Sequence, residues 1–224
     1  MILLVSDLHG RFDVVNKLIA QAVGDGADVS AVIILGDVGL FEPGLNRHFR
    51  KSGARFARPL YFIEGNHEDF TQFDTLVRRY ADVMTHLPRG TIHTIANKRF
   101  LALGGTAYMD ANTTPMGSVI EPRHIDACLR HPAGAVEIVL SHDAPAGLPI
   151  PIEPRFRRSD APGFPGGASL ARHFHPRYWF FGHHHCRFTF ERDGTRYHGL
   201  PECTAGGLIF DPIHDKVTPV VCDT

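Results

Sequence analysis

Short apolar runs alternate with amphipathic stretches in the first third of the chain. The runs ILLVS, AVIIL and PLYFI occupy residues 2–6, 31–35 and 59–63. Continuous apolar runs of this length are typical of strands buried on both faces. Between them, residues 10–23 and 43–57 repeat apolar positions at helical spacing. The pattern therefore predicts β-α-β-α-β, which implies a parallel sheet with crossover helices.

The rest of the chain mixes hairpins with further buried strands. The pattern predicts helices over 69–80, 121–131 and 167–174, strands over 91–95, 99–103, 136–140 and 178–181, and a hairpin over 187–199 that turns at Asp193-Gly194. Residues 143–167 contain six Pro and four Gly, which predicts a long irregular loop. Without a repeat or a linker that would split the chain, we expect one α/β domain over residues 1–224.

Composition narrows the class of protein. Hydrophobic residues make up 43% of the chain and charged residues 21%, and the formal net charge is −1, so no global field indicates a nucleic acid or membrane partner. No apolar run approaches the ~20 residues of a membrane span. The opening MILLVSDLHG is a strand rather than a signal peptide, and the four Cys lack C-x-x-C spacing. We expect a soluble cytoplasmic protein; the sequence does not indicate its oligomeric state.

Polar side chains follow five of the predicted strands at the point where each strand ends. They are Asp7-Leu8-His9, Asp37, Asn66-His67-Glu68, His142-Asp143 and His183-His184-His185. In parallel α/β sheets, ligands bind at the carboxyl ends of the strands. We therefore expect these groups to converge on one place.

The residue types at these strand ends indicate metal binding. Carboxylates, imidazoles and an amide oxygen suit divalent transition-metal ions such as Mn²⁺, Fe²⁺ or Zn²⁺. The seven candidate ligands are Asp7, His9, Asp37, Asn66, His142 and two of the three terminal histidines. Seven ligands are too many for one ion, but they fit two ions about 3.5–4 Å apart that share a bridging carboxylate.

The ordered motifs resemble the signature of the calcineurin-like metallophosphoesterases. The matching positions are Asp7-x-His9, Gly36-Asp37, Gly65-Asn66-His67-Glu68, His142 and Gly182-His183-x-His185. The resemblance implies a four-layer α/β/β/α sandwich with a two-metal centre that takes Mn²⁺, Fe²⁺/Fe³⁺ or Zn²⁺. It further implies one metal ion held by Asp7, His9 and His185, a second held by Asn66, His142 and His183, Asp37 as the bridge, and His67 as the catalytic histidine.

The same resemblance bears on the three consecutive histidines. The residue between the two terminal ligands is variable in the family, so His183 and His185 would be the ligands. The alternation of an extended segment agrees, because it directs alternate side chains to one side. We therefore expect His184 to point away from the metals and to be a bystander.

Two branches of the family show where the chain departs from its relatives. Residues 140–145 and 175–188 are similar to the RNA lariat debranching enzymes, which typically carry Cys where this chain has Asp7. The serine/threonine protein phosphatases have an Asp that supports the catalytic histidine, and Leu40 occupies that position here. Asp69 or a backbone carbonyl is left to orient His67.

The expected activity is hydrolysis of a phosphate ester. Two cations would lower the pKa of a shared water toward ~7, and the resulting bridging hydroxide would attack phosphorus in line. His67 would donate a proton to the leaving oxygen or stabilise the charge on the phosphoryl group. We expect a phosphodiester of a nucleotide or nucleic acid as the substrate. The alternatives are a phosphomonoesterase for small molecules or phosphoproteins, and a catalytically inactive scaffold.

The signals for the substrate lie in the long loop. Arg155, Arg157 and Arg158 could grip a phosphate, or they could belong to a solvated surface. Phe156 and Phe164 could stack a base, or they could anchor the loop.

Overall fold

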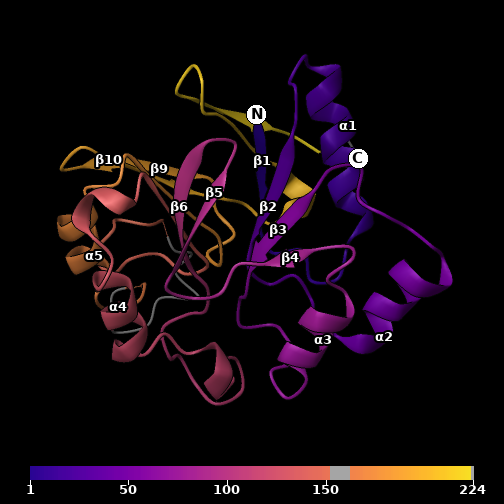
Figure 1. The fold of residues 1–224 in the computed structure, drawn as a ribbon, viewed down its shortest axis with the longest axis horizontal. Helices are drawn as coiled ribbons and strands as arrows, with labels where there is room; N and C mark the ends of the chain where they lie inside the picture. The colour runs from indigo at the N-terminus through magenta and orange to yellow at the C-terminus, as the bar shows by residue number, and fades with distance from the viewer. Residues whose placement is uncertain (152–161, 223–224) are drawn as a thin grey trace.

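The computed structural model describes residues 1–151 and 162–222. The first sheet contains β1 (Ile2–Val5), β2 (Ala31–Leu35), β3 (Leu60–Ile63), β4 (Thr85–His86), β11 (Gly207–Asp211) and β12 (Lys216–Val220). The second contains β5 (Thr91–Ile95), β6 (Lys98–Leu103), β7 (Ile138–Ser141), β8 (Tyr178–Phe181), β9 (Phe188–Arg192) and β10 (Thr195–Gly199). Their strand orders are β12-β11-β1-β2-β3-β4 and β5-β6-β7-β8-β10-β9. Figure 1 shows β1, β2 and β3 of the first sheet side by side.

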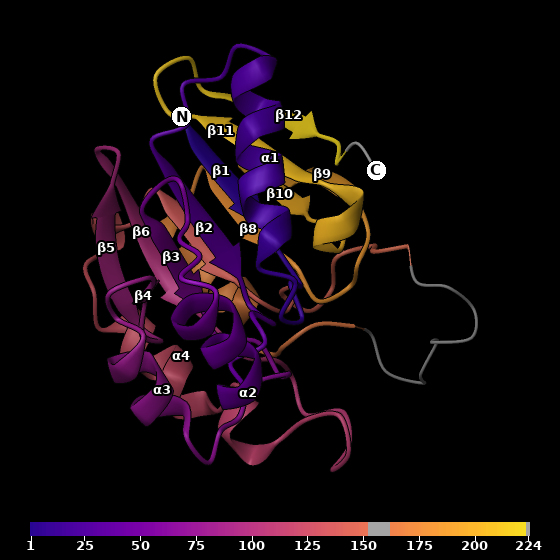
Figure 2. The same cartoon turned by 90° about the vertical axis from the view of Figure 1, so that its right-hand side faces the viewer.

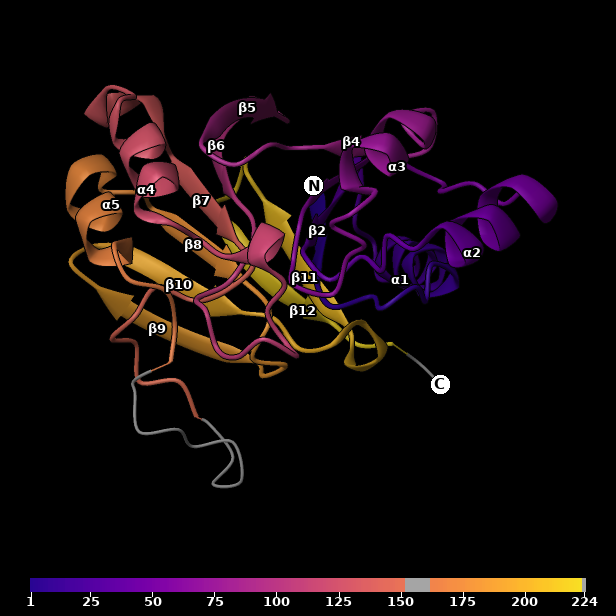
Figure 3. The ribbon, with the colours of Figure 1, turned by 90° about the horizontal axis from the view of Figure 1, so that it is seen from below.

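Helices cover the outer faces of the two sheets. They are α1 (Asp13–Gly24), α2 (Glu42–Leu45), α3 (Phe73–Arg79), α4 (Pro122–Leu129) and α5 (Gly167–Phe174), with a π-helix at Asn46–Lys51 and 3-10 turns at Met116–Ser118, Ala133–Ala135 and Cys203–Ala205. Figure 3 shows α4 and α5 outside the second sheet and α1, α2 and α3 on the opposite side, and Figure 2 shows α1 lying over the first sheet. This is the predicted four-layer α/β/β/α sandwich.

Alternate residues of each central strand belong to different cores. Ile2 and Leu4 of β1 pack between the sheets, whereas Leu3 and Val5 pack under α1. Trp179 of β8 faces the helices of the second sheet, and its neighbour Phe180 faces the first sheet. Both faces of these strands are therefore buried, which explains why they read as continuous apolar runs.

The strand pairing contains the predicted crossovers and adds three strands. β1, β2 and β3 pair in parallel, as the sequence predicts, and the short β4, which it did not predict, pairs parallel with β3. β11 and β12, which the sequence analysis missed, extend this sheet antiparallel beside β1. The two hairpins form where predicted, with β10 paired to β9 and β5 paired to β6.

Two predicted helices are shorter than expected. The helix predicted over 43–57 ends with the π-helix at Lys51, and Gly53 follows with a φ of 68°. Beyond it, the Arg55 guanidinium takes over from helical hydrogen bonding by donating to the carbonyls of Phe49 and Ala54. The helix predicted over 69–80 begins only at Phe73, because Asp69 uses its carboxylate to accept hydrogen bonds from Thr71 and Gln72.

The long loop is anchored at its far end. Phe164 is fully buried and packs against Trp179, with ring centroids 6.3 Å apart, so it anchors the loop and is not free to stack a base. Arg155, Arg157, Arg158 and Phe156 lie outside the described residues. None of the helices in the described ranges is long and apolar enough to cross a membrane.

Candidate metal centre

The ends of β1, β2, β3, β7 and β8 meet at one end of the sandwich, and the predicted ligands come together there. Asp7 lies at the middle of the cluster. It is fully buried, and its carboxylate belongs to two groups of donor atoms, each group spanning no more than 4.8 Å. The two groups are Asp7, His9 and His185, and Asp7, Asp37 and His142.

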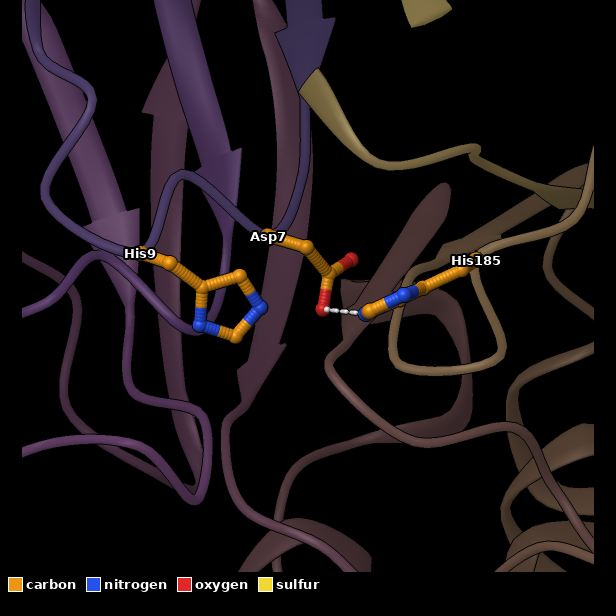
Figure 4. Close-up of side chains that lie close together, drawn as sticks. All are labelled: Asp7, His9 and His185. Carbon is orange, nitrogen blue, oxygen red and sulfur yellow. Dashed lines mark hydrogen bonds and ion pairs between the residues drawn. The ribbon is translucent and has the colours of Figure 1, made fainter. Parts of the chain in front are cut away.

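The first group is the triad that the family resemblance assigns to one metal ion. Asp7 lies between His9 and His185, which come from opposite sides (Figure 4). His185 Nε2 is 3.2 Å from Asp7 Oδ1. The His185 side chain is 46% exposed and that of His9 is 29% exposed, so this side of the centre is open to a substrate.

The second group is deeply buried. His142 Nε2 lies 3.4 Å from Asp37 Oδ1 and 3.2 Å from Asn66 Oδ1. The Asn66 amide nitrogen donates to the Thr113 carbonyl at 2.8 Å, which leaves the amide oxygen facing His142. His142 Nδ1 lies 2.6 Å from the Leu35 carbonyl, a partner that leaves Nε2 as the atom available to an ion.

His183 lies near the centre, but its contacts differ from those of Asn66 and His142, with which it was expected to hold an ion. Its ring lies 5.0 Å from the His142 ring, centroid to centroid, and its backbone N–H donates to Asp7 Oδ2 at 3.1 Å. Its ring nitrogens belong to neither group of closely spaced donor atoms. His183 therefore lies beside the second group without joining it.

Asp37 faces both groups. Oδ2 lies 3.8 Å from His9 Nε2, while Oδ1 is the oxygen that faces His142. Oδ1 also accepts hydrogen bonds from the backbone N–H groups of Asn66 and His67 at 2.7 and 2.8 Å. This close approach requires glycine at position 65, because a Cβ there would collide with Asp37 Oδ1.

The backbone of the centre is held in an unusual conformation. Five of the seven predicted ligands have positive φ angles: Asp7 at 56°, His9 at 47°, Asp37 at 50°, His183 at 63° and His185 at 50°. Such angles are uncommon for residues other than glycine and cost about 1–3 kcal/mol each in strain. The surrounding fold holds that strain at the strand ends, where it directs these side chains inward.

The charges of the centre are mutually dependent. Burial alone would raise the pKa of Asp7 and of Asp37, but their histidine partners lower both: His185 and His142 act on Asp7, and His142 acts on Asp37. Burial would lower the pKa of His142, yet the two carboxylates raise it to about 10. A buried positive charge thus offsets part of the two buried negative ones, and an excess of negative charge is left. Bound cations would neutralise this excess, so the donor set fits divalent metal ions.

His67 lies at the open rim of the centre. Its side chain is exposed, and its ring meets that of His9 edge-on with centroids 5.2 Å apart. Neither candidate for orienting it is observed, because Asp69 bonds to Thr71 and Gln72, and no described residue forms a hydrogen bond with the ring nitrogens of His67. The backbone N–H bond to Asp37 is the contact that fixes its position.

His184 belongs to neither group of donor atoms, as expected, but it does have a polar partner. Its side chain is only 12% exposed, and Nε2 lies 2.9 Å from Asp143 Oδ1. The strand ends at Phe181, and the positive φ angles of His183 and His185 break the alternation on which the expectation rested. Asp143 also accepts backbone N–H bonds from Ala107 and Ala144.

Glu68 is a residue of the centre whose role the sequence analysis missed. Its buried carboxylate accepts backbone N–H bonds from Val38, Gly39 and Leu40 at 2.7–3.0 Å and from Gly65 at 3.4 Å. Burial and repulsion by Asp37 raise the pKa of Glu68 to about 8, against the lowering effect of these hydrogen bonds. Glu68 thus ties the loop after β2 to the loop after β3. Glu68 is part of the Gly65-Asn66-His67-Glu68 motif, and this position was the feature of the sequence that could have indicated its role.

Comparisons with known proteins show the family to which the chain belongs. The profile of the calcineurin-like phosphoesterases matches residues 1–187, and the chain belongs to this family. Members of the family are phosphoester hydrolases that typically use two metal ions. No curated protein sequence matches the chain.

Several solved structures share the fold. Protein TT1561 of Thermus thermophilus is 13% identical with a TM-score of 0.61, and the match covers 99% of this chain and 98% of that one. An archaeal phosphodiesterase is 13% identical with a TM-score of 0.52 and 98% coverage of both chains. The phosphopantetheinyl hydrolase PptH of Mycobacterium tuberculosis is 15% identical with a TM-score of 0.56, covering 90% and 89%. At these identities the likeness concerns the fold.

Proposed function

We propose that the chain is a dinuclear metal-dependent phosphodiesterase acting on a nucleotide or nucleic acid. The observation that carries the proposal is the pair of overlapping donor groups that share Asp7, with Asp37 facing both. One ion would be held by Asp7, His9 and His185. The other would be held by Asn66, His142 and His183, with Asp37 as the bridge. Mn²⁺, Fe²⁺/Fe³⁺ and Zn²⁺ all suit these ligands.

The chain's own residues would bind and orient the ester. When bound, the two ions would offset the charge of the phosphate and acidify the attacking water. The exposed His9 and His185 mark the open side, from which the phosphate would enter. His67 stands at that rim, where its imidazole would donate a proton to the leaving oxygen. Asp37 would keep His67 in place through the backbone N–H bond, because the ring has no hydrogen-bond partner among the described residues.

The test combines metal analysis with two chromogenic substrates. Protein prepared without chelator should carry close to two transition-metal ions per chain. With added Mn²⁺ it should hydrolyse bis-para-nitrophenyl phosphate faster than para-nitrophenyl phosphate. Faster hydrolysis of the monoester would instead support the phosphomonoesterase alternative. Absence of metal, together with no turnover of either ester with Mn²⁺, Fe²⁺ or Zn²⁺, would contradict an enzymatic role and leave the inactive scaffold.

A further inference from the structure

A groove of about 790 Å³ lies between α3 and α4. These helices stand on opposite sides of the connection from β4 to β5 (Figure 3). Glu64 lies in the groove wall two residues before Asn66 of the metal centre. Gly117 lies in the same wall, four residues after the Thr113 carbonyl that orients Asn66. The groove and the metal centre are therefore built partly from the same two segments.

One wall of the groove presents stacked aromatic rings. Phe70 and Phe73 are half-buried, with ring centroids 5.4 Å apart and planes 12° from parallel. Gly117 packs so closely on Phe70 that an added Cβ would lie 2.6 Å from its ring, and the edge of His86 contacts Phe73. These contacts hold the two phenylalanine rings in place. A flat ligand could extend the stack, as nucleobases do on aromatic side chains of binding proteins.

Two charged residues in the wall of the groove, Glu64 and Arg89, neutralise each other. Burial of Glu64 would raise its pKa, but His86 and Arg89 pair with the carboxylate and lower the pKa to about 2. Arg89 also donates to the carbonyls of Gly117 and Val119, so it is a structural cation of the wall. Glu64 and Arg89 therefore cancel each other and contribute little to the binding of a ligand.

Arg78 and Arg123 are the cations available to a ligand. Arg78 is exposed, and no carboxylate in residues 1–151 and 162–222 pairs with it. Arg123 is 72% exposed and bonds to Glu121 at 2.9 Å. Asp74, one turn before Arg78 on α3, is an opposing charge in the groove, and Glu121 offsets part of the charge of Arg123. The balance favours a ligand with one phosphate group over a long polyanion.

We propose that this groove binds the nucleotide unit next to the scissile phosphodiester. The base would stack on Phe70 and Phe73, and the phosphate of that unit would pair with Arg78 and Arg123. The proposal rests on the proposed function, because it assigns the groove to a substrate whose reacting phosphate lies at the metal centre. It predicts that the enzyme prefers a dinucleotide that carries a terminal phosphate over the same dinucleotide without it.

The kinetic test uses adjacent arginines of α3 as a matched pair. Arg78→Gln removes the groove cation, whereas Arg79→Gln removes a cation that pairs with Glu42 at 3.0 Å outside the groove. For the phosphorylated dinucleotide, Arg78→Gln should raise KM about tenfold with little change in kcat, the usual effect of losing a charged hydrogen bond. KM for the unphosphorylated dinucleotide and for bis-para-nitrophenyl phosphate should change less than twofold, and Arg78→Lys should recover most of the loss. Equal KM values in Arg78→Gln and Arg79→Gln would overturn the proposal.

A binding test separates the groove from the catalytic proposal. Adenosine monophosphate and pyrophosphate are titrated calorimetrically into the purified full chain and into both variants. Any binding at the metal centre is common to all three proteins, so the difference between Arg78→Gln and Arg79→Gln reports the groove. A roughly tenfold weakening confined to the nucleotide supports the assignment even if the wild-type protein hydrolyses no ester. Equal weakening for pyrophosphate would show a simple anion site and overturn the nucleotide assignment.

Discussion

His184 Nε2 lies 2.9 Å from Asp143 Oδ1, and this contact ties the ends of β7 and β8 together. Each partner is adjacent to a proposed ligand, since His142 precedes Asp143 and His183 and His185 flank His184. Outer partners of this kind orient ligands, and their loss typically costs about 10–100-fold in metal affinity or activity. We therefore expect His184→Ala to lose metal or turnover by that amount, measured by elemental analysis and by hydrolysis of bis-para-nitrophenyl phosphate.

Two variants serve as controls for His184. Arg187→Ala changes an exposed side chain three residues further along and should leave both measurements unchanged. His184→Gln keeps a group that can donate to Asp143 and should fall between the wild type and His184→Ala. Wild-type metal content and turnover in His184→Ala would show that the residue is a bystander after all.

The parts of the fold that the sequence predicts are those in which burial fixes composition. β1, β2 and β8 are buried on both faces, so they stand out as apolar runs. β12 has only one buried residue, Val220, and contains Pro219, which suits an edge strand and hides it from a pattern search. The π-helix has i→i+5 hydrogen bonds over only six residues, Asn46–Lys51, which is too short for apolar spacing to reveal where the helix ends.

In the candidate site too, some features can be predicted from the sequence and others cannot. Residue types after strands predict which side chains converge, because parallel strands bring their carboxyl ends to one edge. The direction of each side chain depends on local φ angles that the residue types do not specify. The positive φ angles of His183 and His185 take this segment out of the extended conformation, so alternation alone could not predict that His184 contacts Asp143.

His67 and Asp37 should respond differently to substitution. His67 lies at the exposed rim, so His67→Ala should keep the wild-type metal content while kcat falls by about 10²–10⁴-fold, the usual range for a positioned acid or base. Asp37 faces both donor groups, so Asp37→Asn should lose metal. Elemental analysis and steady-state kinetics on both variants make the comparison. Equal metal content and equal activity in the two would contradict the assigned roles.

Glu68 should be important for stability. Glu68→Ala would leave the backbone N–H groups of Val38, Gly39, Leu40 and Gly65 without their carboxylate acceptor. A buried donor without a partner costs about 1–3 kcal/mol, so we expect the free energy of unfolding in urea to fall by at least about 3 kcal/mol. Glu191→Ala removes a glutamate that is 64% exposed and should cost under about 1 kcal/mol. Similar unfolding midpoints for the two variants would rule out this role for Glu68.

Glu64 should make stability depend on pH in a specific window. Burial would raise its pKa, but His86 and Arg89 hold the pKa near 2 in the folded protein, compared with an ordinary value of 4.5. Because the folded pKa is the lower one, the ion pairs stabilise the fold fully above about pH 4.5 and lose their effect as pH falls toward 2. The difference corresponds to about 3 kcal/mol. Glu64→Gln should therefore lower the free energy of unfolding by about that amount at pH 7.

The gap between the wild type and Glu64→Gln should narrow as the pH is lowered from 5 to 3, because only the wild type gains a proton at this position on unfolding. Urea titrations at several pH values measure the gap directly. Glu137→Gln is the matched control, since Glu137 is 33% exposed and its pairs with Lys98 and Arg99 lie near the surface, where such pairs contribute under about 1 kcal/mol. A gap for Glu64→Gln that stays constant over this pH range would mean that the substitution acts through packing and that the charge of Glu64 contributes little.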